Sequence, residues 1–193
     1  MPAKRPSPSA KTKIAHSEIG RALGQLAASI AARHPDATSR RLILIGIANG
    51  GVHVVTRLQL LLREFYPEGA RPRTGILDIS FHRDDIDRNP IPKEFTPTLI
   101  PIDVTGATVI LVDDVLQSGR TVKAALDELF DHGRPAKVEL AVLVDRGGRT
   151  LPVAADYTGI TLATAPSEKV TVVLHATDPR HDAIRVEPAA TKR

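Results

Sequence analysis

Apolar positions along the chain follow two periods, one typical of amphipathic helices and one typical of buried strands. Apolar residues three and four apart predict a helix that begins at Ser17, its expected N-cap, and ends near His34. A continuous apolar run is typical of a strand covered on both faces, and residues 42–47 (LILIGI) have this character. Further strands are expected over 75–80 (GILDIS), 108–112 (TVILV), 138–144 (VELAVLV) and 170–174 (VTVVL). Two further helices are expected over 54–62 and 121–132.

The order of these elements predicts the fold class. Helices separate most of the strands, and such crossovers are right-handed and build parallel sheets. We therefore expect an α/β fold with a central, mostly parallel sheet flanked by helices. Residues 82–106 contain four prolines and many charges, so they are predicted to form a long loop that serves as a lid or a binding loop. Residues 145–166 are predicted to be irregular.

Composition limits the classes of protein that remain. The 193 residues include no Cys, which excludes disulfides, Cys-based zinc sites, iron–sulfur clusters and thiol nucleophiles. No apolar run is long enough to span a membrane and residues 1–13 lack the apolar core of a secretory signal, so we expect a cytoplasmic protein without a membrane partner. The length suits one domain, expected over 14–177 between a disordered basic tail (1–13) and a flexible C-terminal tail (178–193).

The formal net charge of +4 is concentrated at the ends of the chain. Residues 1–13 carry +4 and residues 178–193 carry +1, so residues 14–177 carry −1. A basic chain favours a nucleic-acid partner at first sight, but a nearly neutral body removes most of that argument.

The segment 109–121 (VILVDDVLQSGRT) carries the clearest chemistry in the chain. Two carboxylates, Asp113 and Asp114, follow a buried strand, and a short polar loop leads from them into a helix. Ligands of open parallel sheets bind beyond the carboxyl ends of the strands, and N–H groups at the start of a helix hold phosphate. Gly119 lets the backbone approach closely. Because carboxylates accept hydrogen bonds from vicinal hydroxyls, the segment suits a ribose 5-phosphate, whereas an isolated Asp-Asp pair would be a solvated turn.

This segment resembles the phosphoribosyl-pyrophosphate motif of type I phosphoribosyltransferases. From about residue 19 to residue 174, the chain is similar to the PyrR family, pyrimidine operon regulators with uracil phosphoribosyltransferase activity. The other segments that carry the resemblance are ISFHRDD (79–85), ELFDHGRPA (128–136), LAVLVDRGGRTLP (140–152) and SEKV (167–170). The resemblance implies a type I phosphoribosyltransferase fold with a small hood over the site. It also implies a reaction that joins N1 of uracil to C1 of phosphoribosyl pyrophosphate, giving UMP and releasing pyrophosphate.

The same resemblance assigns roles to residues of this chain. Asp113 and Asp114 are expected to act in catalysis by holding the ribose hydroxyls, together with Arg83 at the start of the mobile loop 82–106. The segment that binds ribose and 5-phosphate comprises Asp113, Asp114, Val115, Leu116, Gln117, Ser118, Gly119, Arg120 and Thr121. The pyrophosphate loop comprises Ala48, Asn49, Gly50 and Gly51, and the hood over the base contains Asp145, Arg146 and Val170. The resemblance also implies Mg²⁺, bound mainly through the substrate rather than by side chains, and a homo-oligomer.

Two departures from the family pattern change these expectations. The family's pyrophosphate loop commonly has Thr-Arg-Gly where this chain has Asn49-Gly50-Gly51, so a cation is missing and we expect weaker binding of phosphoribosyl pyrophosphate through backbone N–H groups. Positions that bind RNA in regulatory members have lost most of their charge, so we expect RNA binding to be weakened or lost. In this chain these positions are Gly24, Gln25, Ala28, Gly148, Arg149, Ala154 and Ile160.

Other interpretations stay open at this stage. The chain could be a UMP-sensing, RNA-binding regulator with little catalysis, a catalytically weak relative, or a transferase that uses a purine base. Among the scattered histidines, His82 has the best claim to contact a ligand because it adjoins Arg83. Glu168 and Lys169 are expected to be surface residues.

Overall fold

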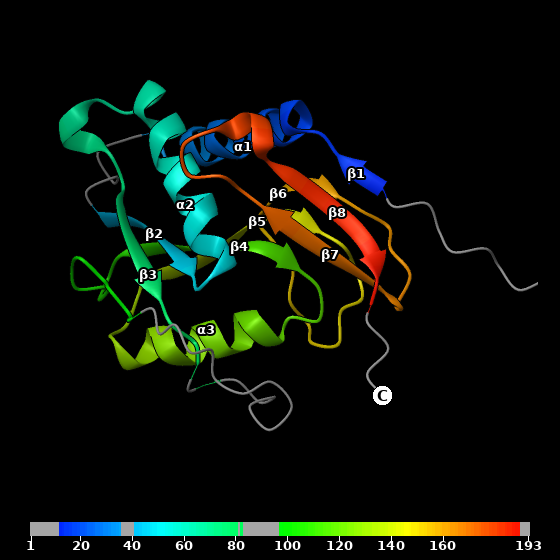
Figure 1. Ribbon diagram of the computed structural model, residues 1–193. Helices are drawn as coiled ribbons and strands as arrows, with labels where there is room; N and C mark the ends of the chain where they lie inside the picture. The colour runs from blue at the N-terminus through cyan, green and yellow to red at the C-terminus, as the bar shows by residue number, and fades with distance from the viewer. Residues whose placement is uncertain (1–11, 36–40, 81, 83–96, 190–193) are drawn as a thin grey trace, which may run out of the picture.

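A five-stranded parallel sheet forms the centre of the protein, as Figure 1 shows. The structure is a computed structural model that describes residues 12–35, 41–80, 82 and 97–189. The strands lie in the order β3-β2-β4-β5-β6, and every neighbouring pair is parallel. Their bounds are Leu42–Ile47 (β2), Arg73–Leu77 (β3), Thr108–Leu116 (β4), Lys137–Asp145 (β5) and Tyr157–Thr161 (β6). The predicted α/β fold with a mostly parallel central sheet is confirmed.

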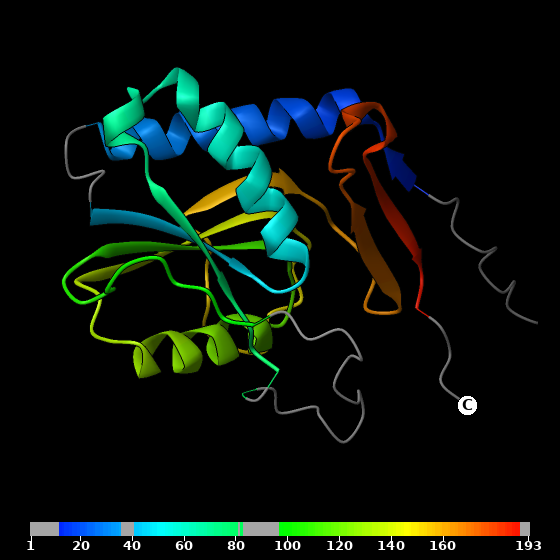
Figure 2. The same cartoon turned by 60° about the vertical axis from the view of Figure 1, so that its left-hand side comes forward.

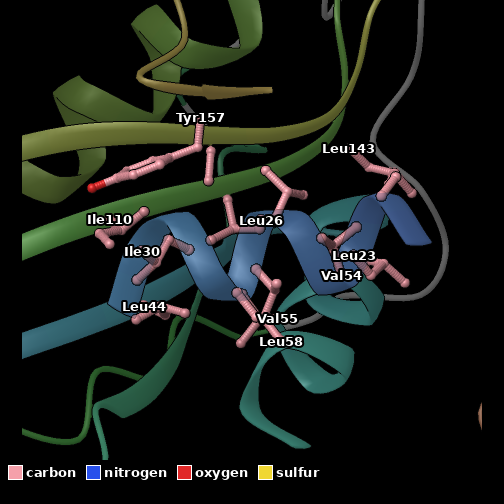
Figure 3. Packing of buried hydrophobic residues seen from close by; sticks show 14 of the residues in the cluster. Leu23, Leu26, Ile30, Leu44, Val54, Val55, Leu58, Ile110, Leu143 and Tyr157 are labelled. Atoms are coloured by element: carbon pink, nitrogen blue, oxygen red, sulfur yellow. The ribbon is translucent and has the colours of Figure 1, made fainter. Parts of the chain in front are cut away.

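Helices cover both faces of this sheet (Figures 1 and 2). Helices α1 (His16–Arg33) and α2 (Gly50–Leu61) lie on one face, and α3 (Arg120–Asp131) lies on the other. Successive strand residues point to opposite faces, so each strand supplies both layers of the core. Figure 3 shows the α1 layer, in which Leu26 and Ile30 pack against residues of α2 and of the sheet. Burial of both faces explains why β2 reads as an unbroken apolar run.

A second, antiparallel sheet stands beside the first and forms the predicted hood. Its order is β1-β8-β7, with bounds Thr12–Ile14 (β1), Glu168–Val173 (β7) and Ala183–Pro188 (β8). The flexible tail expected from residue 178 is therefore wrong, because β8 pairs with β7 along its whole length and with β1 over residues 184–186. Ile184 is buried, and Asp182 just before it forms an ion pair with Arg57 of α2 at 2.9 Å. The expected N-terminal tail is likewise too long by two residues, which belong to β1.

Several predicted boundaries also move. Strand β4 continues through Leu116 rather than ending at Val112, because its ladder with β5 extends to the pair Leu116–Asp145. Strand β6 lies in the segment predicted to be irregular. The N-cap of α1 is Ala15 instead of Ser17. The strand expected over 75–80 is β3, which begins and ends earlier in the chain.

The predicted long loop is described only in part. Residues 83–96, Arg83 included, lie outside the described residues. Beyond them the chain returns to the sheet, where Leu99 and Ile76 exchange backbone hydrogen bonds of 2.8 and 2.9 Å. The last part of the predicted loop is therefore bound to β3. Among the helices that the structure describes, none is long and apolar enough to cross a membrane.

A buried carboxylate anchors the C-terminal end of α1 to the sheet. Glu139 of β5 is almost wholly buried, and its side chain accepts hydrogen bonds from His34 at 2.9 Å and from the Tyr157 hydroxyl at 2.6 Å. Lys137 forms an ion pair with the same carboxylate at 2.6 Å. Burial alone would raise the pKa of Glu139, but these partners outweigh it and lower the pKa to about 2. Glu139 lies towards the amino end of β5, so this network serves stability rather than ligand binding at the opposite edge.

Glu139→Gln is expected to lower the free energy of unfolding by about 3 kcal/mol at pH 7. The pKa of Glu139 is depressed in the folded chain, so its contribution is complete above the ordinary glutamate pKa of 4.5 and is lost as the pH falls towards 2. Urea unfolding between pH 7 and pH 3 should therefore show the variant and the native chain converging below pH 4.5. Glu64→Gln, at an exposed position, is the control and should change little. A difference in the free energy of unfolding that stays constant across the pH range would show that the Glu139 charge is not the cause.

Candidate functional site

A pocket of about 200 Å³ lies where the carboxyl end of β4 faces the hood. Three parts of the chain line it: the segment from Asp113 into α3, the residue that follows β5, and the start of β7. The lining residues are Asp113, Val115, Leu116, Gln117, Ser118, Gly119, Thr121, Arg146, Lys169 and Val170. The structure therefore brings most of the expected ribose and 5-phosphate segment together with two of the expected hood residues.

Asp113 lies at the base of this pocket and is only 6% exposed. One of its carboxylate oxygens accepts a hydrogen bond from the backbone N–H of Asp114 at 2.9 Å. Burial raises the pKa of Asp113 well above its usual range, and the negative charge of Asp114 raises it further. A desolvated carboxylate of this kind is a strong acceptor for ligand hydroxyls and interacts strongly with positive charge.

Asp114 lies in a different environment from its neighbour. Its carboxylate occupies the space that a side chain on Gly50 would need, at the start of α2. Burial raises the pKa of Asp114 too, although hydrogen bonds and the nearby His53 oppose that shift. Asp114 is not among the residues that line the pocket. The two neighbouring carboxylates therefore have different surroundings, although a side-chain hydrogen bond between them contributes to the pKa shifts of both.

The expected pyrophosphate loop is a tight turn between β2 and α2. Ala48 donates a hydrogen bond to the Leu77 carbonyl at 3.0 Å, and the Ala48–Asn49 peptide bond is cis. Gly50 and Gly51 are the first residues of α2 rather than loop residues. A Cβ on Gly51 would overlap the carbonyl oxygen of Val112 in β4, so only glycine allows this close contact. The turn therefore lies directly beside the acidic end of β4.

The loop between β4 and α3 has the form of an anion site. Gly119, the N-cap of α3, has a φ of 91°, and Leu151 and Val153 fill the space beside it. Ser118 accepts a hydrogen bond from the Arg120 backbone N–H at 3.3 Å. The first turn of α3 contains no acidic residue, so its N–H groups and dipole favour an anion. Arg120 is exposed and does not line the pocket.

Arg146 connects the turn after β5 to the start of β7 in the second sheet. Its buried guanidinium donates hydrogen bonds to the carbonyls of Glu168 at 2.8 Å and of Ala165 at 3.1 Å. This contact fixes the start of β7, where Lys169 and Val170 line the pocket. Lys169 was expected to be a surface residue, and although it is exposed it also faces the site. Its position next to Val170 in the SEKV segment is the sequence signal that could have indicated it.

Two other predicted residues have partners within the protein. The carboxylate of Asp145 binds Arg149 at 2.5 Å and accepts the Gly147 N–H at 2.9 Å, so it stabilises the turn after β5. His82 pairs with Glu128 at 3.0 Å and lies 3.5 Å from Asp131, both on α3. Among the residues that the structure describes, His82, Glu128 and Asp131 are the three side chains close enough together to bind one metal ion. None of them lines the pocket.

Comparisons with known proteins agree with this geometry. The sequence profile of the phosphoribosyl transferase domain family matches residues 12–177. The "Bifunctional protein PyrR" of Chloroflexus aurantiacus is 46% identical over 169 residues, which cover 87% of this chain and 90% of that protein. The protein of the same name from Corynebacterium efficiens is 53% identical over 143 residues, 72% of each chain. The hypoxanthine phosphoribosyltransferase of Trypanosoma cruzi in complex with IMP has a TM-score of 0.65 at 20% identity, over 96% of this chain and 94% of that chain, which shows a common fold.

Proposed function

This chain belongs to the PyrR family of phosphoribosyltransferases, and we propose that it joins uracil to phosphoribosyl pyrophosphate, giving UMP and pyrophosphate. The observation that carries this proposal is the pocket itself. One wall offers a buried carboxylate and a helix N-terminus suited to a ribose 5-phosphate, and the facing wall offers the hood residues Arg146, Lys169 and Val170 for a base.

The residues around the pocket suit a reaction that develops positive charge on the ribose. As the bond between C1 and pyrophosphate breaks, the ring acquires oxocarbenium character; N1 of uracil forms the new bond to C1 and releases its proton, which leaves with pyrophosphate or to water. Asp113 would accept hydrogen bonds from the ribose hydroxyls and stabilise the developing charge, because its carboxylate is shielded from water. The N–H groups at Ser118, Gly119 and the start of α3 would hold the 5-phosphate and fix C1 relative to the base.

We propose that Mg²⁺ enters the site with the diphosphate of the substrate. Around Asp113 the structure offers one lining carboxylate and no set of three ligand groups among the residues described, which fits an ion that keeps substrate and water oxygens as ligands. Mg²⁺ bound in this way neutralises the leaving diphosphate. Asp113 would then remain available to the ribose.

The proposal predicts uracil rather than a purine as the acceptor base. With phosphoribosyl pyrophosphate and Mg²⁺, the native chain should form UMP, and hypoxanthine or guanine should react at least about 100-fold more slowly by kcat/KM. Chromatographic detection of the nucleotide products measures both. No UMP from the folded protein would remove the proposal, and faster purine transfer would replace uracil with a purine. The likeness to hypoxanthine phosphoribosyltransferases shows the fold alone and does not decide this point.

Weak binding of phosphoribosyl pyrophosphate is part of the same proposal. The position of the family's Arg is Gly50, and the Asp114 carboxylate fills the space beside it. Backbone N–H groups at the start of α2 remain to bind the diphosphate. Calorimetric titration with phosphoribosyl pyrophosphate and Mg²⁺ tests the altered turn directly.

An RNA-binding regulator is the alternative function, and we expect RNA binding to be weak. The positions on α1 that regulatory members use are Gly24, Gln25 and Ala28, none of which carries a charge. Each lost phosphate contact reduces both the affinity and its salt dependence. Filter binding to the leader RNA of a pyrimidine operon, with UMP present, should show little affinity at 150 mM salt. UMP-stimulated binding with a steep salt slope would instead favour the regulator.

A further inference from the structure

The loop that follows β4 is held by a second stretch of chain, residues 146–151, here called the bracing segment. The Arg146 backbone N–H donates to the Leu116 carbonyl at 3.1 Å. The backbone N–H groups of Thr150 and Leu151 both donate to the Ser118 carbonyl at 3.0 Å. The Arg149 side chain donates to the Gln117 carbonyl at 3.0 Å. Three consecutive carbonyls, those of Leu116, Gln117 and Ser118, are therefore bound by one short segment.

This pattern determines where the N–H groups of the same loop point. In a trans peptide, the C=O and the N–H lie on opposite sides of the chain. The peptide bonds between Leu116 and Gly119 are trans, so the N–H groups of Gln117, Ser118 and Gly119 all point away from the bracing segment. These loop residues line the pocket. Of the bracing segment, Arg146 also lines it, whereas Arg149, Thr150 and Leu151, which bind the Gln117 and Ser118 carbonyls, do not. Successive N–H groups that converge in this way form an anion-binding concavity.

Arg149 is the side chain that completes this arrangement. Its guanidinium donates to Gln117 as described and, at 3.4 Å, to the Leu116 carbonyl; it also donates to the Val153 carbonyl at 3.0 Å and binds the Asp145 carboxylate. The side chain is 24% exposed. The planar guanidinium can serve four acceptors at once, which a lysine ammonium cannot do in this geometry. Without it, the Gln117 carbonyl loses its bond to the bracing segment.

We infer that Arg149 is a positioning residue for the 5-phosphate of the ligand, an inference that rests on the proposed function. Arg149 does not line the pocket; it acts through the loop carbonyls, which it holds turned away from the site. A carbonyl oxygen free to rotate toward the pocket would repel the phosphate and withdraw an N–H donor. Arg149 is the one charged residue at the positions expected to bind RNA. Its hydrogen-bond donors are used within the protein, and the positioning role accounts for its presence.

The test compares a ligand that carries the 5-phosphate with one that lacks it. Arg149→Gln is expected to weaken binding of UMP about 10- to 100-fold, while the affinity for uridine changes less than about 3-fold. Arg149→Lys keeps the charge but not the fork of donors, so its UMP affinity should lie between those of Arg149→Gln and the native chain. Arg63→Gln makes the same change in charge at an exposed position beyond α2 and should match the native chain. Competition titrations give the dissociation constants of UMP and uridine for each variant. Thermal unfolding without ligand shows whether each variant is folded.

The outcomes separate this inference from the proposed function. If the folded native chain forms no UMP, the proposed function fails. If the native chain binds UMP and the Arg149 variants bind it equally well, the positioning role is overturned while the proposed function stands. A parallel loss of UMP and uridine affinity would show a general structural role instead. Should Arg149→Gln fail to fold, the ratio of UMP to uridine affinity in Arg149→Lys decides the question.

Discussion

Gly51→Ala is expected to lower the free energy of unfolding by about 3 kcal/mol and to impair the site with it. A Cβ at this position would overlap the carbonyl oxygen of Val112, and it would lie 3.2 Å from the Cα of Asp113. Both neighbours are backbone atoms of the central strand β4, so no side chain can turn aside to make room. Either α2 moves outward or the end of β4 shifts, and the second change displaces Asp113.

Gly24→Ala is the matched control, with an expected effect of opposite sign. Gly24 lies inside α1, and a Cβ there would meet nothing within 4 Å. Alanine removes backbone freedom from the unfolded chain, so this variant should be more stable by about 0.5 to 1 kcal/mol. Urea unfolding of the two variants, together with UMP formation, measures both expectations. Equal and small effects at the two positions would show that α2 does not need its close approach to β4.

Local pattern was enough to predict the elements that build the central sheet. Strands β2, β4 and β5 are buried on both faces, so their apolar runs stand out against any neighbouring segment. Strand β6 was missed because it is short and contains Gly159, where the sheet lies close to α1 and a Cβ would come within 3.3 Å of Leu26. Strand β8 was missed for a different reason. Besides β7, it pairs with residues 12–14 at the other end of the chain, and pairing over that sequence distance leaves no local signal.

In the candidate site too, features within one short segment could be predicted, whereas contacts between distant segments could not. The acids, the glycine and the hydroxyls of residues 113–121 could be recognised because one local unit, from strand through loop to helix, contains them all. The different surroundings of Asp113, which lines the pocket, and Asp114, which lies against Gly50, were not predicted, because the strand was expected to end at Val112. The contact of Arg149 with the loop carbonyls joins residues 32 and 33 positions apart, and the resemblance to the family suggested only RNA binding for this arginine.

Asp113→Asn is expected to lower kcat/KM for UMP formation by about 10²- to 10³-fold. Asparagine keeps one oxygen but removes the negative charge that would stabilise the cationic ribose in the transition state. Asp114→Asn should cost less, because that carboxylate lies against Gly50 rather than in the pocket lining. Asp127→Asn on α3, which only breaks an ion pair with Lys123, is the matched control and should leave the rate unchanged.

The pKa of Asp113 provides a second and independent measurement of the same role. Because burial raises this pKa, the ionised carboxylate is less stable in the folded chain than in the unfolded chain. Its unfavourable contribution is complete above the folded pKa, decreases as the pH falls below that value, and is absent only below the ordinary aspartate pKa of 3.8, so Asp113→Asn should not lower the stability at pH 7. In the pH profile of UMP formation, the native rate should decrease on the acid side at a pH above the ordinary aspartate range. The variant should lack this decrease. A variant that loses stability and activity together would assign Asp113 to the fold, whereas loss of activity in a chain of equal or greater stability assigns it to the reaction.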